Sequence, residues 1–62
     1  MSAGPELSSI STALTSLTER ISGLADSMSG TERDDVAAAL FEVERSLTTA
    51  QRRLDKVVGQ LI

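Results

Sequence analysis

The apolar residues of this chain fall into two matching series, and the symmetry between them constrains the fold. Both series advance in alternating steps of three and four residues, which is the spacing of an amphipathic helix. When the first series is paired in reverse with the second, the two residue numbers of every pair add to 64. The seven pairs are Leu7 with Val57, Ile10 with Leu54, Leu14 with Ala50, Leu17 with Leu47, Ile21 with Val43, Leu24 with Leu40, and Met28 with Val36. A chain that reverses near residue 32 would stack them in seven layers.

Local signals place the reversal and the two helices. Pro5 suits the first position of a helix because its φ angle is fixed and its nitrogen carries no hydrogen. Gly30 can adopt the left-handed conformation that closes a helix. Thr31 then fits an N-cap, with Asp34 in the capping-box position three residues later. We therefore predict a disordered N-terminus over 1–4, then a single helical hairpin over 5–62 with a helix over 5–29, a turn over 29–31 and a helix over 32–61.

The repeat averages 3.5 residues, which predicts coiled-coil-like packing with a left-handed supercoil. The fold class is therefore all-α, an antiparallel two-helix hairpin. A single seam leaves each apolar stripe half exposed, and a chain of 62 residues is in the size range where one core is marginal. Small residues flank the stripes, where further helices can approach closely: Ala13, Ser27, Ala39 and Ser46 on one side, Ala25 and Ala37 on the other. These features predict that two hairpins dimerise into a four-helix bundle.

The second helix offers the candidate interface of this dimer. Phe41, Val58 and Ile62 extend its apolar surface beyond a narrow stripe, although scattered exposed apolar residues are also normal on a protein surface. The charges of this helix are asymmetric, because acidic residues dominate 31–44 and basic residues dominate 45–56. Glu42 and Glu44 would face Arg52 and Arg53 across a two-fold axis. The predicted interface residues are Phe41, Ala37, Val58, Ile62, Leu61, Glu44, Arg52 and Arg53.

The outer face of the first helix is rich in hydroxyl side chains and poor in charge. Its members are Ser8, Ser9, Ser11, Thr12, Thr15, Ser16, Thr18 and Ser22. Serine and threonine are mediocre helix formers and do not usually crowd an exposed helix. This face is either a solvated polar surface or a flat, uncharged surface on which a partner protein packs, and the sequence favours neither.

The composition argues against catalysis and against cofactor or metal binding. The chain has no Cys and no His, which removes disulfides, thiolate metal sites and the usual general base. Its glycines are isolated, so no Gly-rich phosphate-binding loop is present. One aromatic residue and a net charge of −3 argue against nucleic-acid binding. Arg45, Arg52 and Arg53 could bind an anionic small molecule if a dimer duplicated them, but ion pairs with neighbouring acids explain them more simply.

The sequence thus predicts a non-catalytic protein-interaction module, a self-associating hairpin that acts as a scaffold or small adaptor. The alternative is a small regulator of the antitoxin or anti-sigma kind, completed by a larger protein partner. The N-terminal residues do not have the pattern of a secretory signal, and no apolar run is long enough to span a bilayer. We therefore expect a cytoplasmic protein that does not bind membranes. The excess of Arg over Lys suggests a bacterial source.

Overall fold

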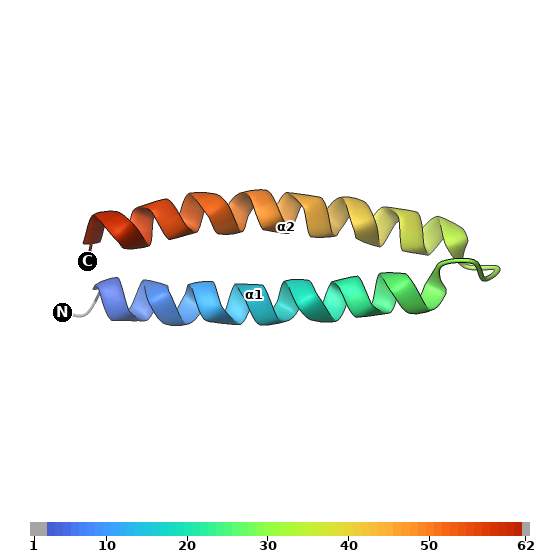
Figure 1. The fold of residues 1–62 in the computed structure, drawn as a ribbon, viewed down its shortest axis with the longest axis horizontal. Helices are drawn as coiled ribbons and strands as arrows, with labels where there is room; N and C mark the ends of the chain where they lie inside the picture. The colour runs from blue at the N-terminus through green and yellow to red at the C-terminus, as the bar shows by residue number, and fades with distance from the viewer. Residues whose placement is uncertain (1–2, 62) are drawn as a thin grey trace.

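The computed structural model describes residues 3–61, which form two α-helices packed against each other. Helix α1 spans Ala3–Met28 and helix α2 spans Asp34–Leu61, and these residues contain no strand. The two helices run antiparallel along their whole length, with both ends of the chain at one end of the molecule and the turn at the other (Figure 1). The predicted all-α hairpin is confirmed.

The first helix begins two residues earlier than predicted. Helix α1 starts at Ala3, so Pro5 occupies its first turn and not its first position. The first four N–H groups of a helix have no partner within it, so the missing N–H of Pro5 breaks no hydrogen bond. Residues 3 and 4 therefore belong to the helix, whereas residues 1 and 2 of the predicted disordered segment lie outside the described residues.

Gly30 closes the end of α1 in the left-handed conformation, with φ at +78°. The backbone N–H of Ser29 donates to the carbonyl of Ala25 at 3.0 Å, and that of Thr31 donates to the carbonyl of Met28 at 3.2 Å. These bonds satisfy carbonyls that the helix itself leaves without a donor. The glycine is thus required at the position where the sequence predicted it.

The N-terminus of α2 is capped differently from a capping box. The hydroxyl of Thr31 accepts the N–H of Arg33 at 3.1 Å, in the manner of a cap. The carboxylate of Asp34, however, accepts the N–H of Gly30 and not that of Thr31. The N–H of Asp34 donates three residues back to Thr31, at 3.2 Å, so the first turn is tight and the α-helix begins at Asp34. This start lies two residues beyond the predicted one.

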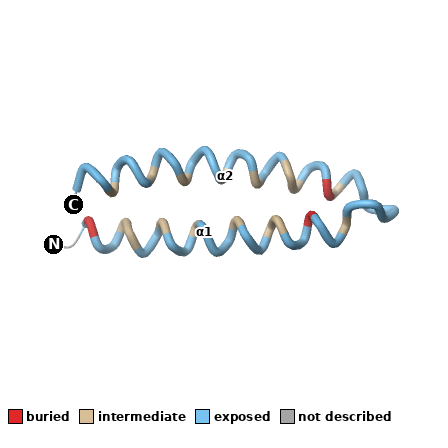
Figure 2. Tube along the Cα trace, viewed as in Figure 1, coloured by how far each residue is buried: buried red, intermediate tan, exposed pale blue. Residues whose placement is uncertain are grey.

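The core of the hairpin is thin. Ala25 and Ala37 are the hydrophobic residues that are buried, at 0% and 2% exposure, and none of the large side chains of residues 3–61 is fully buried. Most positions that are buried or half-buried face the other helix (Figure 2). The half-buried large side chains are Leu7, Leu14, Ile21 and Met28 on α1, and Val36, Leu40, Phe41, Leu47, Leu54 and Val58 on α2.

The central row of the seam consists of Leu7, Leu14, Ile21 and Met28 on α1, and Leu40, Leu47 and Leu54 on α2. The rows of residues beside it differ from the predicted ones. Three of the seven residues in each predicted stripe are exposed: Ile10, Leu17 and Leu24 on α1, and Val43, Ala50 and Val57 on α2. The seam instead uses the residues that precede a central leucine or isoleucine by three positions or follow it by four. They are Gly4, Ser11, Thr18 and Ala25 on α1, and Ala37, Glu44, Gln51 and Val58 on α2, of which Gly4, Ala25 and Ala37 are buried and the others half-buried. The α1 row consists of small side chains, over which a second helix can approach more closely than over Ile or Leu. The predicted composition of the seam is therefore wrong at these positions.

The lengthwise register nevertheless agrees with the prediction. Ser11 forms hydrogen bonds with both Gln51 and Asp55. These two residues flank position 53, which is the position that pairs with residue 11 when the numbers add to 64. The helices are therefore aligned as the sequence indicates but rotated about their own axes.

Candidate interaction surface

The rotation of the helices leaves large apolar side chains about half exposed on one side of the hairpin. We define the apolar face as Ile10, Leu17, Leu24, Val43, Ala50 and Val57. Its large side chains retain between 43% and 54% of their accessible surface. Single exposed apolar residues are normal, but contiguous rows of them are characteristic of an interaction site.

Both rows of the apolar face lie on the same side of the hairpin. Thr15 of α1 and Thr48 of α2 line one shared hollow, so they lie on one face. Leu17 and Ala50 follow them by two residues, which is a rotation of about 200° around each helix. They therefore point to the opposite side. The other members repeat at intervals of seven residues from Leu17 and Ala50 and continue the same two rows.

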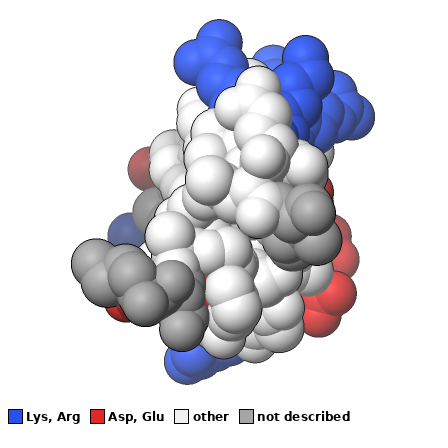
Figure 3. Space-filling model, turned by 90° about the vertical axis from the view of Figure 1, so that its left-hand side faces the viewer, with Lys and Arg blue, Asp and Glu red and all other residues white. Residues whose placement is uncertain are grey.

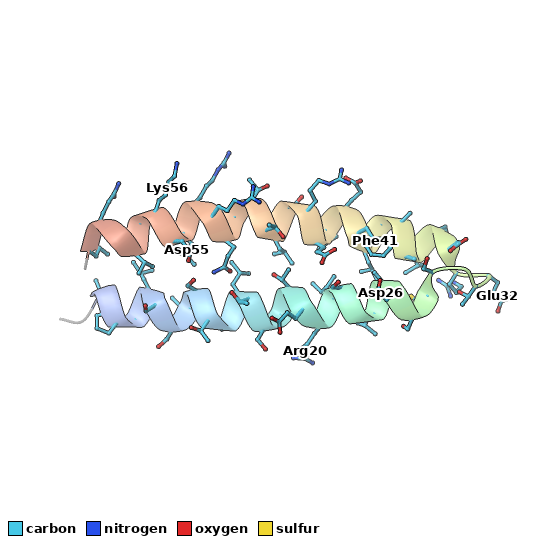
Figure 4. The ribbon with its side chains drawn as sticks, in the orientation of Figure 1. Arg20, Asp26, Glu32, Phe41, Asp55 and Lys56 are labelled. Carbon is cyan, nitrogen blue, oxygen red and sulfur yellow. The ribbon has the colours of Figure 1, made fainter. Side chains whose placement is uncertain are left out.

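The outer edges of the apolar face are mostly uncharged. The residues three positions after or four positions before its members are Glu6, Ala13, Arg20 and Ser27 on α1, and Ala39, Ser46, Arg53 and Gln60 on α2. All of them are exposed. Four of the eight are Ala or Ser, and side chains as small as these do not hold another helix at a distance. Arg20, which Figure 4 shows pointing away from α2, contributes charge at the outer edge only.

The opposite side of the hairpin carries the polar contacts between the two helices. The hydroxyl of Ser11 donates to Asp55 Oδ1 at 2.7 Å. The Nε2 group of Gln51 donates to the carbonyl of Ser11 at 3.1 Å and also contacts Asp55 Oδ1 at 3.3 Å. Asp55 lies on the α1 side of its helix, whereas the neighbouring Lys56 points outward (Figure 4). Beside this network lies a shallow hollow of about 160 Å³, which is lined by Thr15, Thr18, Glu19, Thr48 and Gln51.

The threonine hydroxyls of α1 are satisfied by the helix itself. Thr12, Thr15 and Thr18 each donate to the carbonyl four residues earlier, at 3.1, 3.2 and 2.8 Å. A hydroxyl that is already bonded in this way needs water less than a free one does. The hydroxyl-rich surface is thus less polar than its composition indicates, and this observation leaves open both of its interpretations, a solvated face and a partner-binding face.

The interface residues predicted from the sequence do not gather on one surface. Ala37 is buried, while Phe41, Glu44 and Val58 are half-buried; Leu61, Arg52 and Arg53 are exposed, and Ile62 lies outside the described residues. Phe41 lies on the side of α2 that faces α1 (Figure 4), and it precedes Val43 of the apolar face by two residues. The same 200° rotation therefore separates Phe41 from the apolar face.

The charged side chains of α2 show one internal ion pair. Arg45 Nη1 lies 3.1 Å from Glu42 Oε1, with both side chains largely exposed. Such a pair contributes little to stability, at most about 1 kcal/mol. Glu42 thus has a partner within its own helix. The Lys and Arg side chains gather on the outer side of α2 when the molecule is viewed from the end that carries the termini (Figure 3).

Neither a membrane span nor a metal-binding group is found within residues 3–61. Neither α1 nor α2 contains a segment that is both long enough and apolar enough to cross a bilayer. These residues also contain no cluster of three or more acidic, His or Cys side chains arranged to hold a metal ion. What the described surface offers is a half-exposed apolar face.

The apolar face is the surface feature that the periodicity alone did not predict. Its residues were assigned to the seam because they complete the heptad with Leu7, Leu14 and Ile21. A second signal in the sequence could have identified it: Gly4, Ser11, Thr18 and Ala25 form a row of small residues at intervals of seven. Such a row marks the side on which a helix can be approached most closely.

No protein-family profile, curated protein or solved structure matches this chain.

Proposed function

We propose that this chain is a non-catalytic protein-interaction module, which associates with a second copy through its apolar face and forms a four-helix bundle. The bundle would serve as a scaffold or small adaptor. The observation that supports this proposal is the pair of exposed apolar rows on one side of the hairpin. Burying such rows is the main driving force for the association of helical proteins in water.

The broad side of the hairpin is large enough for a dimer. The Cα trace extends 49 Å by 15 Å by 11 Å, so this whole side, with the apolar face in its middle part, covers roughly 700 Å², close to the ~800 Å² that each partner buries in a standard interface. The same face is self-complementary in kind, because both helices contribute a row of apolar side chains to it. An isologous dimer uses one patch twice and is the commonest oligomer.

The proposed contact surface differs from the one predicted around Phe41. Ala37 is 2% exposed in the single hairpin and has almost no surface left to give to a second copy. Phe41 is half-buried on the other side of α2. Leu17, Val43 and Ala50 replace these residues at the centre of the proposed interface.

A second candidate function has one observation in its favour. Since the core of residues 3–61 contains only Ala25 and Ala37 as buried hydrophobic residues, the hairpin has little to stabilise it alone. A small regulatory protein of the antitoxin or anti-sigma kind would gain that core from a larger partner. In this case the apolar face would bind the partner and not a second copy.

Light scattering after size exclusion, combined with circular dichroism over a dilution series, tests the first proposal. A species of twice the 6.6 kDa chain mass, which loses helicity on dilution, is the expected result. A monomer of low helicity at every concentration would contradict self-association and favour the regulatory candidate.

A pair of variants ties the result to the apolar face. Ala50→Glu places a charge in the middle of this face, whereas Thr49→Glu places the same charge on the neighbouring exposed residue outside it. We expect the Ala50 variant to be monomeric at concentrations where the Thr49 variant is dimeric. Equal behaviour of the two variants would show that the dimer, if present, uses another surface.

A further inference from the structure

We infer that the second copy lies antiparallel on the apolar face, with the two turns at opposite ends of the bundle. This inference rests on the proposed function and specifies the partner and its orientation. The two-fold axis would then cross the long axis of the hairpin near its middle, and each helix would pack against its own copy. Leu17 and Ala50, which lie close to the midpoints of α1 and α2, would be near this axis.

The distribution of charge along the hairpin carries the inference. The half that contains the turn, residues 17–47, has seven acids and three bases, a net charge of −4. The acids are Glu19, Asp26, Glu32, Asp34, Asp35, Glu42 and Glu44, and the bases are Arg20, Arg33 and Arg45. The other half, residues 3–16 and 48–61, has Glu6 and Asp55 against Arg52, Arg53 and Lys56, a net charge of +1.

The two possible orientations of the second hairpin differ in which charged halves lie against each other. If the turns lay at the same end, a half of charge −4 would cover another half of charge −4. If they lay at opposite ends, each acidic half would cover a half of charge +1. Packed helices are about 8–10 Å apart and the Debye length in 0.1 M salt is about 10 Å, so charges at the edges of the interface still interact. The antiparallel stack therefore avoids the electrostatic repulsion between the two acidic halves.

The middle of the hairpin also suits contact between a helix and its own copy. Ala50 is on the apolar face and Ser46 is at its edge, both close to the midpoint of α2. Small side chains at the crossing point allow two copies of α2 to approach closely. On α1, Leu17 supplies the bulk that fills the space beside them.

Distances between spin labels distinguish the two orientations. Because the chain has no Cys, a single cysteine can be labelled cleanly. Ser29→Cys puts a label beside the turn, at an exposed residue whose side chain makes no hydrogen bond in the structure. Ser16→Cys puts one at an exposed position near the middle of α1, where the two labels of a dimer lie at a similar distance in either orientation. Both are measured by double electron–electron resonance, with light scattering on the same labelled samples.

The antiparallel dimer predicts a distance near the 49 Å length of the hairpin for the label at position 29, together with a clearly shorter one for the label at position 16. Short distances at both positions would overturn the orientation and keep the proposed self-association. A monomeric mass with no dipolar signal from either label would overturn the proposed function and this inference together.

Discussion

Two glycines show how the same residue can have opposite effects in one hairpin. Gly30 has a φ of +78°, whereas Gly23 lies within α1 with a helical backbone. A Cβ atom at either position would meet no atom within 4 Å, so packing does not decide the effect of a substitution there. Backbone conformation alone decides it.

We expect Gly30→Ala to lower the free energy of unfolding by about 1–2 kcal/mol, because an L-residue is strained in the left-handed region. Gly23→Ala should raise the same free energy by about 1 kcal/mol, since alanine loses less backbone entropy in a helix. Urea titrations followed by circular dichroism at one fixed protein concentration give both values. Shifts of the same sign would contradict this account of the turn.

Gln51 is a half-buried polar residue whose side-chain amide is only partly hydrogen-bonded. Its Oε1 atom is buried and has no hydrogen-bond partner, while its Nε2 group contacts Ser11 and Asp55. An unpaired buried acceptor costs about 1–3 kcal/mol. Ser11 and Asp55 would keep their own bond at 2.7 Å if the amide were removed.

Gln51→Leu should therefore raise the free energy of unfolding by about 1 kcal/mol, because it removes the unpaired acceptor and adds apolar contact at the seam. The exposed Gln60 gives the matched control, and Gln60→Leu should change this free energy little. Thermal melts of both variants provide the comparison. A clear loss of stability in the Gln51 variant would mean that its hydrogen bonds contribute more than its unpaired atom costs.

At the scale of the helices, the sequence predicted the hairpin and its register but not the rotation of the faces. Periodicity identifies which residues are apolar, and the signals at Gly30 and Thr31 locate the turn. On α1, a central apolar stripe with small residues on one side and Ile or Leu on the other can meet a partner on either side. The close approach of α2 over Ser11 and Ala25 decides which side is used. Such an approach depends on how two helix surfaces fit together, and the apolar pattern of one helix does not reveal it. The predicted interface around Phe41 followed from the apolar residues beyond this stripe and from the charges of the second helix, and it stays a prediction.

The close approach near the turn can be tested with two neighbouring alanines. Ala37 is buried at the seam and Ala38 is exposed beside it. Ala37→Leu should lower the free energy of unfolding by about 1–3 kcal/mol, since the extra side chain must push the helices apart. Ala38→Leu should have almost no effect, because leucine and alanine have similar helix propensities. Circular dichroism melts of both variants measure this, and a stabilised Ala37 variant would show that the helices have room to spare at this level.

At the scale of the whole molecule, folding and association are expected to be one equilibrium. Within residues 3–61 the buried hydrophobic residues are two alanines, so in the proposed dimer most of the further apolar burial would come from the second copy. The melting temperature should therefore rise with protein concentration over a hundredfold range, as it does for coupled dimers. Melting curves that superimpose at all concentrations would indicate a hairpin that folds alone.

The extended outline of the hairpin has a hydrodynamic consequence. Its radius of gyration is 14.4 Å, compared with about 11 Å for a globular chain of this length. A rod of these proportions tumbles slowly and elutes early from a gel-filtration column, so calibration against globular standards overstates its mass. Stacking a second hairpin on the broad face would thicken the rod without lengthening it. Mass would then double while the frictional ratio falls towards that of a sphere, and sedimentation velocity would record this as a particle that becomes rounder as it grows.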